Sequence, residues 1–599
     1  MRVLPLIATG LLVTAASPAA ASIAAAQQAV RIHDIQGTTR VSPLDGQQVS
    51  GVTGVVTGVR SAGSARGFWF QDPQPDADPR TSEGLFVHTG EQTPQVAVGD
   101  AVVVTGQVAE HYPTSGDQTP ENTPNQSVTQ LTRATWQVSG TGAISPEVLT
   151  EDTAPVEHAP ADGAIDSREL EPQRFALDFY ESREAMVLRV DDARVVGPTD
   201  EYRSLWITSK PAQNANERGG TTYTGYADAN AGRLKVESLL AGEFPSAVVG
   251  DRLRGSTSGP LDYSSFGGYV LEAGQLGAHV PGGLRPETTR AQQDDELAVA
   301  TYNVENLDPA DEQTKFDRLA RGVVENLAAP DVLALEEVQD NTGATDDGVV
   351  AADETLRRFT DAIAAEGGPR YQWRQIDPGN NADGGEPGGN IRVAFLFNPA
   401  RVSFVDRPGG DATTPVEPVA DGDRAALNVS PGRIDPANPA WADSRKPLAG
   451  EFLFGGRPVF VVANHFNSKG GDQPLHGRFQ PPARSSEQQR TEQAEAVRGF
   501  VDRTLAVDPQ ASIVVAGDLN DHGFSPALAP LAEVMTAPAD ALPPVERYSY
   551  VYEGNSQQLD HILLTGPHAA DYDIVHVNAE FPDQISDHDP QVVRLRAAE

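Results

Sequence analysis

The sequence predicts a layered α/β domain in its C-terminal half, preceded by two small all-β domains. With 599 residues, the chain is too long for one ordinary domain. Its N-terminal half contains short β-branched segments between glycine-rich turns. From residue 297 onward, apolar strand-like runs alternate with helical patterns instead. Since 39% of the residues are hydrophobic, the chain can bury an extended core.

Residues 1–26 have the layout of a secretory signal peptide. Arg2 carries a positive charge, residues 3–13 form a short apolar run, and small residues follow, with candidate cleavage after Ala21 or Ala26. The alternative is a buried N-terminal helix. No later run in the sequence reaches the roughly 18 apolar residues that a membrane span requires. We therefore expect a secreted protein without a membrane span, released from the cell or associated with the cell wall.

Composition and charge exclude several classes of protein. The absence of cysteine rules out a disulfide scaffold, a thiolate zinc site and cysteine catalysis. The net charge is −39, and both halves of the chain are negative. A broad basic face of the kind that sequence-reading nucleic-acid binders use is therefore excluded. Nucleic acid as a substrate would have to be bound through metal ions and a few local cations. The sequence implies no protein partner.

The first β domain is expected over residues 28–145. Its predicted strands cover residues 49–59, 67–72, 84–88, 99–108 and 127–131. Regularly spaced short strands with glycine turns indicate a barrel or a sandwich. In this domain and in the next, Trp69 and Trp206 are candidates for stacking on bases or sugars; the alternative is that they are half-buried strand aromatics.

A second β-rich domain is expected over residues 172–280. A segment rich in proline, alanine and acidic residues, 145–172, is predicted to be the linker before it. Gly99-Asp100 and Gly250-Asp251 each precede a predicted strand, which suggests a diverged repeat of one barrel type. Coincidence is the alternative, because Gly-Asp is a common turn sequence.

The C-terminal domain is expected over residues 296–599. Its predicted strands cover residues 299–304, 332–335, 393–397, 459–463, 512–516, 559–564 and 592–595, and its predicted helices cover 315–327, 353–365 and 485–505. Strands with helices between them indicate a layered α/β domain. The glycine-, proline- and aspartate-rich stretches 378–390 and 406–440 are predicted to be long loops beside a site.

Polar side chains follow many of these strands directly. They are Asn303, Glu305, Glu336, Glu337, His465, Asp518, Asn520, Asp587 and His588. Each of them alone fits a turn or a helix cap. Asp560, however, lies inside an apolar strand, where an unpaired carboxylate would cost several kcal/mol, so it should have a partner. The recurrence predicts that these side chains converge on one acidic pocket.

Such a pocket suits a hard cation. Carboxylate and amide oxygens are preferred ligands of Mg²⁺ or Mn²⁺, and Ca²⁺ is a further candidate. A metal of this kind polarises a phosphoryl oxygen. A histidine paired with a carboxylate can activate the attacking water, because the carboxylate fixes the imidazole tautomer and raises its basicity. The pattern therefore predicts hydrolysis of a phosphodiester.

The order of the clusters resembles the endonuclease/exonuclease/phosphatase superfamily, which includes deoxyribonucleases. The motifs are Thr-Tyr-Asn-Val-Glu-Asn-Leu at 301–307, Leu-Ala-Leu-Glu-Glu-Val at 333–338, Asn-His-Phe at 464–466, Gly-Asp-Leu-Asn at 517–520 and Ser-Asp-His-Asp-Pro at 586–590. The resemblance implies a four-layer α/β sandwich. The first β domain resembles the OB-fold-like domain that precedes the nuclease domain in several secreted bacterial nucleases.

The resemblance also implies a metal site. Glu337 matches the family's principal metal ligand. Asn303 and Glu305 match residues that orient this ligand or add another, and Asp587 matches a residue used at the metal site in some members. Glu336 departs from the family, which usually has glutamine here, and is expected to add a charge beside the metal.

The remaining matches concern water and phosphate. His588 matches the general base, with Asp560 as its carboxylate partner, and His465 matches a histidine that stabilises or protonates phosphate oxygens. Asp518 and Asn520 match the pair that positions the attacking water and the scissile phosphate. Arg392 and Lys469 are either phosphate contacts or solvated surface cations.

Three functions are consistent with these observations. The leading hypothesis is a secreted, metal-dependent nuclease with little sequence specificity, acting on DNA and with RNA as a second candidate substrate. The second is a phosphoesterase of the same fold that acts on phospholipid headgroups or phosphomonoesters. The third is a binding protein with an inactive catalytic domain, which predicts a broken set of site residues. Every expected position is filled, which favours an enzyme.

Overall fold

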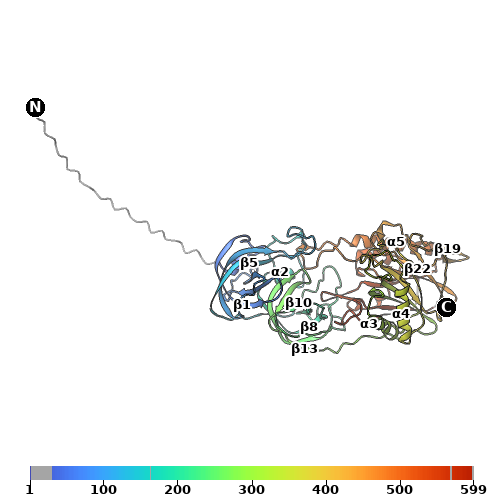
Figure 1. The fold of residues 1–599 in the computed structure, drawn as a ribbon, viewed down its shortest axis with the longest axis horizontal. Helices are drawn as coiled ribbons and strands as arrows, with labels where there is room; N and C mark the ends of the chain where they lie inside the picture. Colours follow the sequence, from blue (N-terminus) through green and yellow to red (C-terminus); the bar gives the residue numbers. More distant parts are fainter. Residues whose placement is uncertain (2–29, 162, 567–569, 597–599) are drawn as a thin grey trace.

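The computed structural model describes Met1 and residues 30–161, 163–566 and 570–596. Apart from Met1, the predicted signal peptide lies outside the described residues. The two β-rich parts lie at one end of the molecule and the C-terminal domain at the other (Figure 1). Within the described part of the chain, no helix combines the length and the apolar character that crossing a membrane requires.

The first β-rich part is a closed five-stranded barrel. Its strands are β1 (Gln48–Arg60), β2 (Arg66–Gln71), β3 (Gly84–Gly90), β4 (Asp100–His111) and β5 (Val128–Thr141), and helix α1 (Ile32–Gln36) packs beside them. The strands pair around the barrel in the order β1-β2-β3-β5-β4, and β3 and β5 run parallel. Side chains such as Val52, Phe68 and Leu131 fill the barrel. Trp69 is wholly buried and is therefore a core residue.

The second β-rich part repeats these pairings. Its strands are β6 (Glu147–Leu149), β8 (Val187–Gly197), β9 (Leu205–Thr208), β10 (Arg233–Ser238), β11 (Arg252–Ser264), β12 (Gly268–Ala273) and β13 (Ala278–Val280). The ring runs β8-β9-β10-β12-β11 and closes through pairing of β11 with β8, with a parallel β10–β12 pair. The two Gly-Asp pairs of the sequence stand at equivalent places, at the starts of β4 and β11.

The predicted linker contains regular structure. Strand β6 pairs in parallel with β8, and β7 (Gly163–Ala164) pairs with β24 (Phe479–Gln480) of the C-terminal domain. Helix α2 (Ala176–Glu181) follows directly. The proline-rich composition concealed these short elements, because a two- or three-residue strand leaves no alternating pattern in a sequence.

The C-terminal domain contains two mixed sheets. The first has the order β16-β17-β15-β14-β30-β29, and the second has the order β18-β22-β23-β25-β28, with β21 paired to β22. The strands of the first sheet are β14 (Glu296–Leu307), β15 (Val332–Val338), β16 (Gln372–Arg374), β17 (Arg392–Phe397), β29 (Ala570–Ile574) and β30 (Gln591–Arg596). Those of the second sheet are β18 (Ser403–Phe404), β21 (Gly432–Arg433), β22 (Leu448–Phe454), β23 (Arg457–His465), β25 (Ser512–Asp518) and β28 (Asp560–Leu564).

Helices cover the outer faces of the two sheets. Helices α3 (Gln313–Arg321) and α4 (Asp353–Ala365) pack on the first sheet, and α3 ends in a π-helical turn over Gly322–Asn326 rather than continuing as one regular helix to residue 327. Helices α5 (Glu487–Val507) and α6 (Ala529–Ala532) pack on the second sheet. A third apolar core lies between the sheets. This arrangement is consistent with a four-layer sandwich.

Alternation along the strands carries polar groups to the inner faces. On β14, Leu297 and Val299 contribute to the core between the sheets, so the same face of the strand continues through Asn303. On β25, Val514 and Ala516 do the same, and Asp518 follows them. The sheets therefore present their site residues to each other just beyond the apolar core.

Candidate active site

Glu337 is oriented by the first strand of the domain. Asn303 Nδ2 donates to Glu337 Oε1 at 3.0 Å, and the backbone N–H of Asn306 donates to Oε2 at 3.0 Å. The backbone N–H of Glu305 donates to Asn303 Oδ1 at 3.0 Å, which fixes the amide in turn. Both Glu337 oxygens are thus aimed by β14 before any ligand binds.

Several site residues have a strained backbone, as do non-glycine residues elsewhere in the described chain. Glu305, Glu337 and Asn520 have φ of +49°, +63° and +52°, a region that costs non-glycine residues about 1–3 kcal/mol each. Gly517 has φ +144°, and a Cβ there would lie 2.0 Å from the carbonyl oxygen of Asn464, so only glycine fits. Such strain persists where the surrounding structure fixes it, and it is common at functional sites.

The second sheet supplies three side chains in register. His465 of β23 pairs with Asp518 of β25, and Asp518 pairs with Asp560 of β28. Asn520 donates to both oxygens of Asp518, from its backbone N–H at 2.8 Å and from Nδ2 at 3.1 Å. His465 Nε2 lies 3.5 Å from Asp518 Oδ2 and 3.8 Å from Glu337 Oε1, so it stands between the two sheets.

His588 and Asp560 form a buried pair. His588 Nδ1 lies 2.7 Å from Asp560 Oδ2, and the Ser549 hydroxyl donates to the same oxygen at 2.6 Å. Burial lowers the pKa of His588, but Asp560, Asp518 and Asp587 outweigh it and raise this pKa well above its usual value. The ring of Tyr550 lies against the imidazole, with centroids 4.8 Å apart. Ser549 precedes a hairpin and Tyr550 begins its first strand, so neither follows a strand and the strand-end pattern did not reveal them.

The pKa of His465 is shifted in the opposite direction to that of His588. Burial, and then the charges of Arg445 and His588, lower its pKa well below the usual value, so the imidazole is neutral. Arg445 is itself buried, donates to the Phe466 carbonyl at 2.6 Å, and interacts electrostatically with Glu337 and Asp518. Sequence reasoning did not single out Arg445, because it lies within a loop beyond any strand end.

Carboxylates outnumber cations at this site. Burial, followed by the charges of Asp587 and Glu337, raises the pKa of Glu305 to about 7. Burial likewise raises the pKa of Asp518 to about 7, although His588 opposes the shift. Asp518, Asp560 and His588 have donor atoms within 4.8 Å of one another. Crowded oxygen donors that raise each other's pKa fit a divalent cation, which relieves their repulsion.

The two predicted phosphate-binding cations lie in different settings. Arg392 is 1% exposed, and its guanidinium donates to the carbonyls of Asn390 and Val350 and to Asp377 Oδ1. These loop contacts occupy the Arg392 guanidinium and speak against its role as a phosphate contact. Lys469 is partly exposed and lies 3.0 Å from Asp521 Oδ1.

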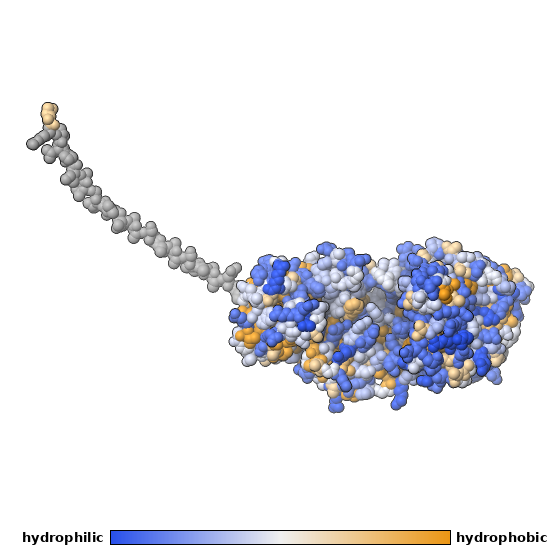
Figure 2. Space-filling model, viewed as in Figure 1, coloured by the Kyte–Doolittle hydropathy of each residue, from blue (hydrophilic) through white to orange (hydrophobic). Residues whose placement is uncertain are grey.

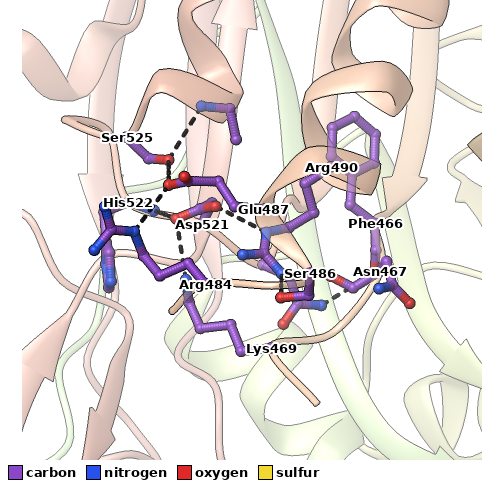
Figure 3. A network of polar contacts seen from close by, with 12 residues as sticks. Phe466, Asn467, Lys469, Arg484, Ser486, Glu487, Arg490, Asp521, His522 and Ser525 are labelled. Carbon is purple, nitrogen blue, oxygen red and sulfur yellow. Dashed lines mark hydrogen bonds and ion pairs between the residues drawn. The ribbon is translucent and has the colours of Figure 1, made fainter. Parts of the chain in front are cut away.

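A buried network supports the turn after β25 (Figure 3). Arg490 of α5 donates from Nε to Asp521 Oδ2 at 2.8 Å, and both side chains are fully buried. Lys469 Nζ donates to Asp521 Oδ1 at 3.0 Å, so two cations contact the Asp521 carboxylate. Burial raises the pKa of Asp521, but Lys469 and Arg490 outweigh it and lower this pKa to about 2. The network thereby anchors the segment that carries Asn520 to α5.

Glu336 is a buried carboxyl group that precedes Glu337 on β15. It is wholly buried and accepts a hydrogen bond from the Thr301 hydroxyl at 2.8 Å. Burial, reinforced by Asp560 and Asp518, raises its pKa well above the usual value. The raised pKa favours the uncharged form of Glu336 and so opposes the expectation that this residue adds a charge.

Glu336→Gln is expected to stabilise the protein, and increasingly so as the pH rises. With a raised pKa, Glu336 must take up a proton on folding above the unfolded-state pKa of about 4.3, at a cost that grows by up to about 1.4 kcal/mol per pH unit. Glutamine removes this cost. Thermal unfolding midpoints at pH 5 and pH 8, measured in chelator, test this. An equal shift at both pH values would contradict the prediction.

Two family models match this chain. Residues 300–588 match the endonuclease/exonuclease/phosphatase family, and residues 145–281 match a domain of unknown function, DUF8508. The comparison with curated proteins gave no match.

Among solved structures, a truncated Caenorhabditis elegans TDP2 is 17% identical, with 50% of this chain and 98% of that chain covered and a TM-score of 0.32. An endonuclease/exonuclease/phosphatase from Bacteroides vulgatus is 15% identical, with 51% and 99% covered and a TM-score of 0.32. A humanized D. rerio TDP2 with 14 mutations is 16% identical, with 51% and 100% covered and a TM-score of 0.32.

The assignment rests on the family match, which covers strands of both sheets, although β30 lies beyond it, and every site residue from Asn303 to His588. Residues 300–588 are thus a domain of the endonuclease/exonuclease/phosphatase family, a superfamily of hydrolases that act on phosphate esters.

Proposed function

We propose that this protein is a secreted, metal-dependent nuclease that hydrolyses phosphodiester bonds of DNA with little sequence specificity, and that RNA is a second substrate. The observation that carries the proposal is that the His588–Asp560 pair and Glu337, oriented by Asn303, belong to one cluster: His588 Nε2 lies 3.9 Å from Asp518 Oδ2, and His465 Nε2 lies 3.5 Å from the same oxygen and 3.8 Å from Glu337 Oε1. A base and an acidic oxygen cluster facing each other are what phosphodiester hydrolysis requires.

In the proposed reaction, His588 accepts the proton of the attacking water at Nε2, since Nδ1 is committed to Asp560. Asp560 fixes the tautomer and is itself held by the Ser549 hydroxyl. Asp518 and Asn520 position the water and the scissile phosphate. His465, neutral and aimed between Asp518 and Glu337, donates a hydrogen bond to a phosphate oxygen.

The acidic cluster is proposed as a Mg²⁺ site, with Mn²⁺ or Ca²⁺ as substitutes. Glu337 would be the main ligand, and Asn303, Glu305 and Asp587 would orient it or add to it. When bound, such an ion polarises a phosphoryl oxygen and offsets the repulsion between the carboxylates and the phosphate. Lys469 would contribute a cation at the edge of the site, 3.0 Å from Asp521.

Nucleic acid is proposed as the substrate because of the two barrels. The strand order β1-β2-β3-β5-β4 is a five-stranded closed barrel, which fits an OB-like assignment, and the second β-rich part repeats it. OB folds commonly bind single strands through aromatic stacking. The net charge of −39 and the mainly hydrophilic face in Figure 2 suit a soluble exported protein, in keeping with the signal-peptide layout of residues 1–26.

A substrate panel tests the proposal. Supercoiled plasmid, single-stranded DNA, RNA, sphingomyelin and a chromogenic phosphomonoester are each incubated with Mg²⁺, Mn²⁺, Ca²⁺ or chelator, with His588→Ala as the control. We expect cleavage of the nucleic acids with Mg²⁺ or Mn²⁺ and none in chelator. Turnover of sphingomyelin or the monoester alone would favour the second phosphoesterase hypothesis, and no turnover of any substrate would contradict an enzyme.

A further inference from the structure

We propose that an aromatic track runs from His588 over a hairpin onto the second barrel, and that it stacks the bases of a single-stranded nucleic acid beside the scissile phosphate. We define the track as Tyr550, Tyr552 and Phe266. The inference rests on the proposed nuclease function, and it assigns a role to the second barrel.

The track begins at the catalytic pair. The ring of Tyr550 lies against the His588 imidazole, with centroids 4.8 Å apart and planes inclined by 36°. Tyr552 stands next to it on the same face of β26 (Tyr550–Tyr552), with ring centroids 6.2 Å apart and planes inclined by only 12°. Tyr552 is 52% exposed, so its ring is open to a ligand. The rings of Tyr550 and Tyr552, nearly parallel to each other, therefore lead away from the base to an exposed ring.

The second barrel holds this hairpin in place. β26 pairs with β27 (Asn555–Gln557), and the turn between them reaches the barrel. Arg233 Nη1 donates to the Glu553 carbonyl at 2.6 Å, and Asn230 Nδ2 donates to Asn555 Oδ1 at 2.7 Å. A Cβ on Gly554 would lie 2.6 Å from the Cβ of Trp206, so the turn packs closely against that residue.

The same arginine joins a second turn to the first. Arg233 Nη2 donates to the Gly267 carbonyl at 3.1 Å, in the turn between β11 and β12. Phe266, the preceding residue, is 71% exposed. Because one buried guanidinium binds the carbonyls of Glu553 and Gly267, the exposed residues that directly precede them, Tyr552 and Phe266, lie on segments that are fixed to each other. Trp206, which the sequence suggested as a candidate for stacking, packs closely against both turns.

A single strand is the occupant that this arrangement fits. Bases in a duplex are already stacked on each other, whereas the exposed faces of unpaired bases stack on aromatic rings. Every base has such a face, so stacking tolerates any sequence. Stacking also needs no broad basic surface, which reconciles nucleic-acid binding with a chain of net charge −39.

The test compares two 12-nucleotide DNA strands with the same backbone, one carrying bases and one built from abasic tetrahydrofuran units. KM for each is measured with Mg²⁺ for the wild type, Tyr552→Ala, Phe266→Ala and the ring-preserving Tyr552→Phe. Val419→Ala, at an exposed apolar residue of β19 (Pro418–Asp421) at the far end of the catalytic domain, is the matched control.

The track predicts that the wild type has a lower KM for the strand with bases than for the abasic strand. Each alanine variant should raise the KM of the strand with bases by about 5- to 150-fold, the equivalent of about 1–3 kcal/mol per base, and bring the ratio of the two KM values toward one. Tyr552→Phe and Val419→Ala should keep the wild-type ratio. Thermal unfolding of each variant checks that it is folded, and truncation of such exposed side chains removes no core contacts.

Three results would overturn the inference while leaving the nuclease proposal intact: equal KM values for the two strands in the wild type, a Tyr552→Phe variant as impaired as Tyr552→Ala, or a lower KM for a blunt duplex than for the single strand. If the wild type cleaves neither strand nor any duplex, the proposed function itself fails.

Discussion

His588→Ala is expected to lower kcat/KM on single-stranded DNA by about 10²- to 10⁴-fold, the range typical for loss of a positioned general base. The imidazole is buried, held at Nδ1 by Asp560 and packed against Tyr550, so it is the positioned base of the site. Kinetics with Mg²⁺ at pH 7.5 measure the effect. His111→Ala, at an exposed histidine of the first barrel, is the matched control and should retain wild-type kinetics.

The pH dependence of kcat/KM in Asp560→Asn tests the His588–Asp560 pair. Asp560 is the strongest of the charges that raise the pKa of His588, so its neutralisation should lower that pKa. Because the base acts unprotonated, the acidic limb of the kcat/KM profile should move to lower pH, while the maximum falls as the imidazole loses its orientation. A His588→Ala variant with wild-type activity, or an Asp560→Asn variant whose acidic limb does not move, would remove this pair from the mechanism.

The polar residues at the strand ends predicted the site because side-chain alternation and strand register fix where such residues lie in a sheet. Once Val514 and Ala516 face the core, alternation places Asp518 on the same face, and the register then brings it beside His465 and Asp560. The positions of the strands followed from the same alternation of apolar residues. The sequence thus contained enough information to place these side chains around one space, although their roles remain predictions.

Side chains outside that pattern could not be placed from the sequence. Arg445 and Tyr550 reach the site from a loop and from a hairpin, and their approach depends on tertiary packing. Arg392 shows the converse: it begins a strand next to a predicted loop, yet the fold buries it against Val350 and Asp377. The charge state of Glu336 likewise depends on burial, which no local sequence feature reveals.

Glu337→Gln is expected to abolish measurable nuclease activity at low millimolar Mg²⁺, with a loss of at least about 10³-fold. Glutamine keeps the shape, but it replaces a carboxylate oxygen, the ligand that a hard cation prefers, by an amide. Asn303→Ala should cost less, about 10- to 100-fold, because Asn303 orients Glu337 and such outer partners have effects of that size.

The measurement that separates metal binding from other roles is a Mg²⁺ titration followed by both activity and thermal unfolding. The wild type should gain stability as Mg²⁺ is added, since a ligand that binds only the folded state stabilises it. Glu337→Gln should lose that gain, and Asn303→Ala should shift it to higher Mg²⁺. Glu325→Gln, at an exposed glutamate of the same domain, controls for the loss of one negative charge. If Glu337→Gln kept both the activity and the Mg²⁺-dependent stabilisation, the ion would be held by other groups. The cluster of Asp518, Asp560 and His588 would then be the next candidate.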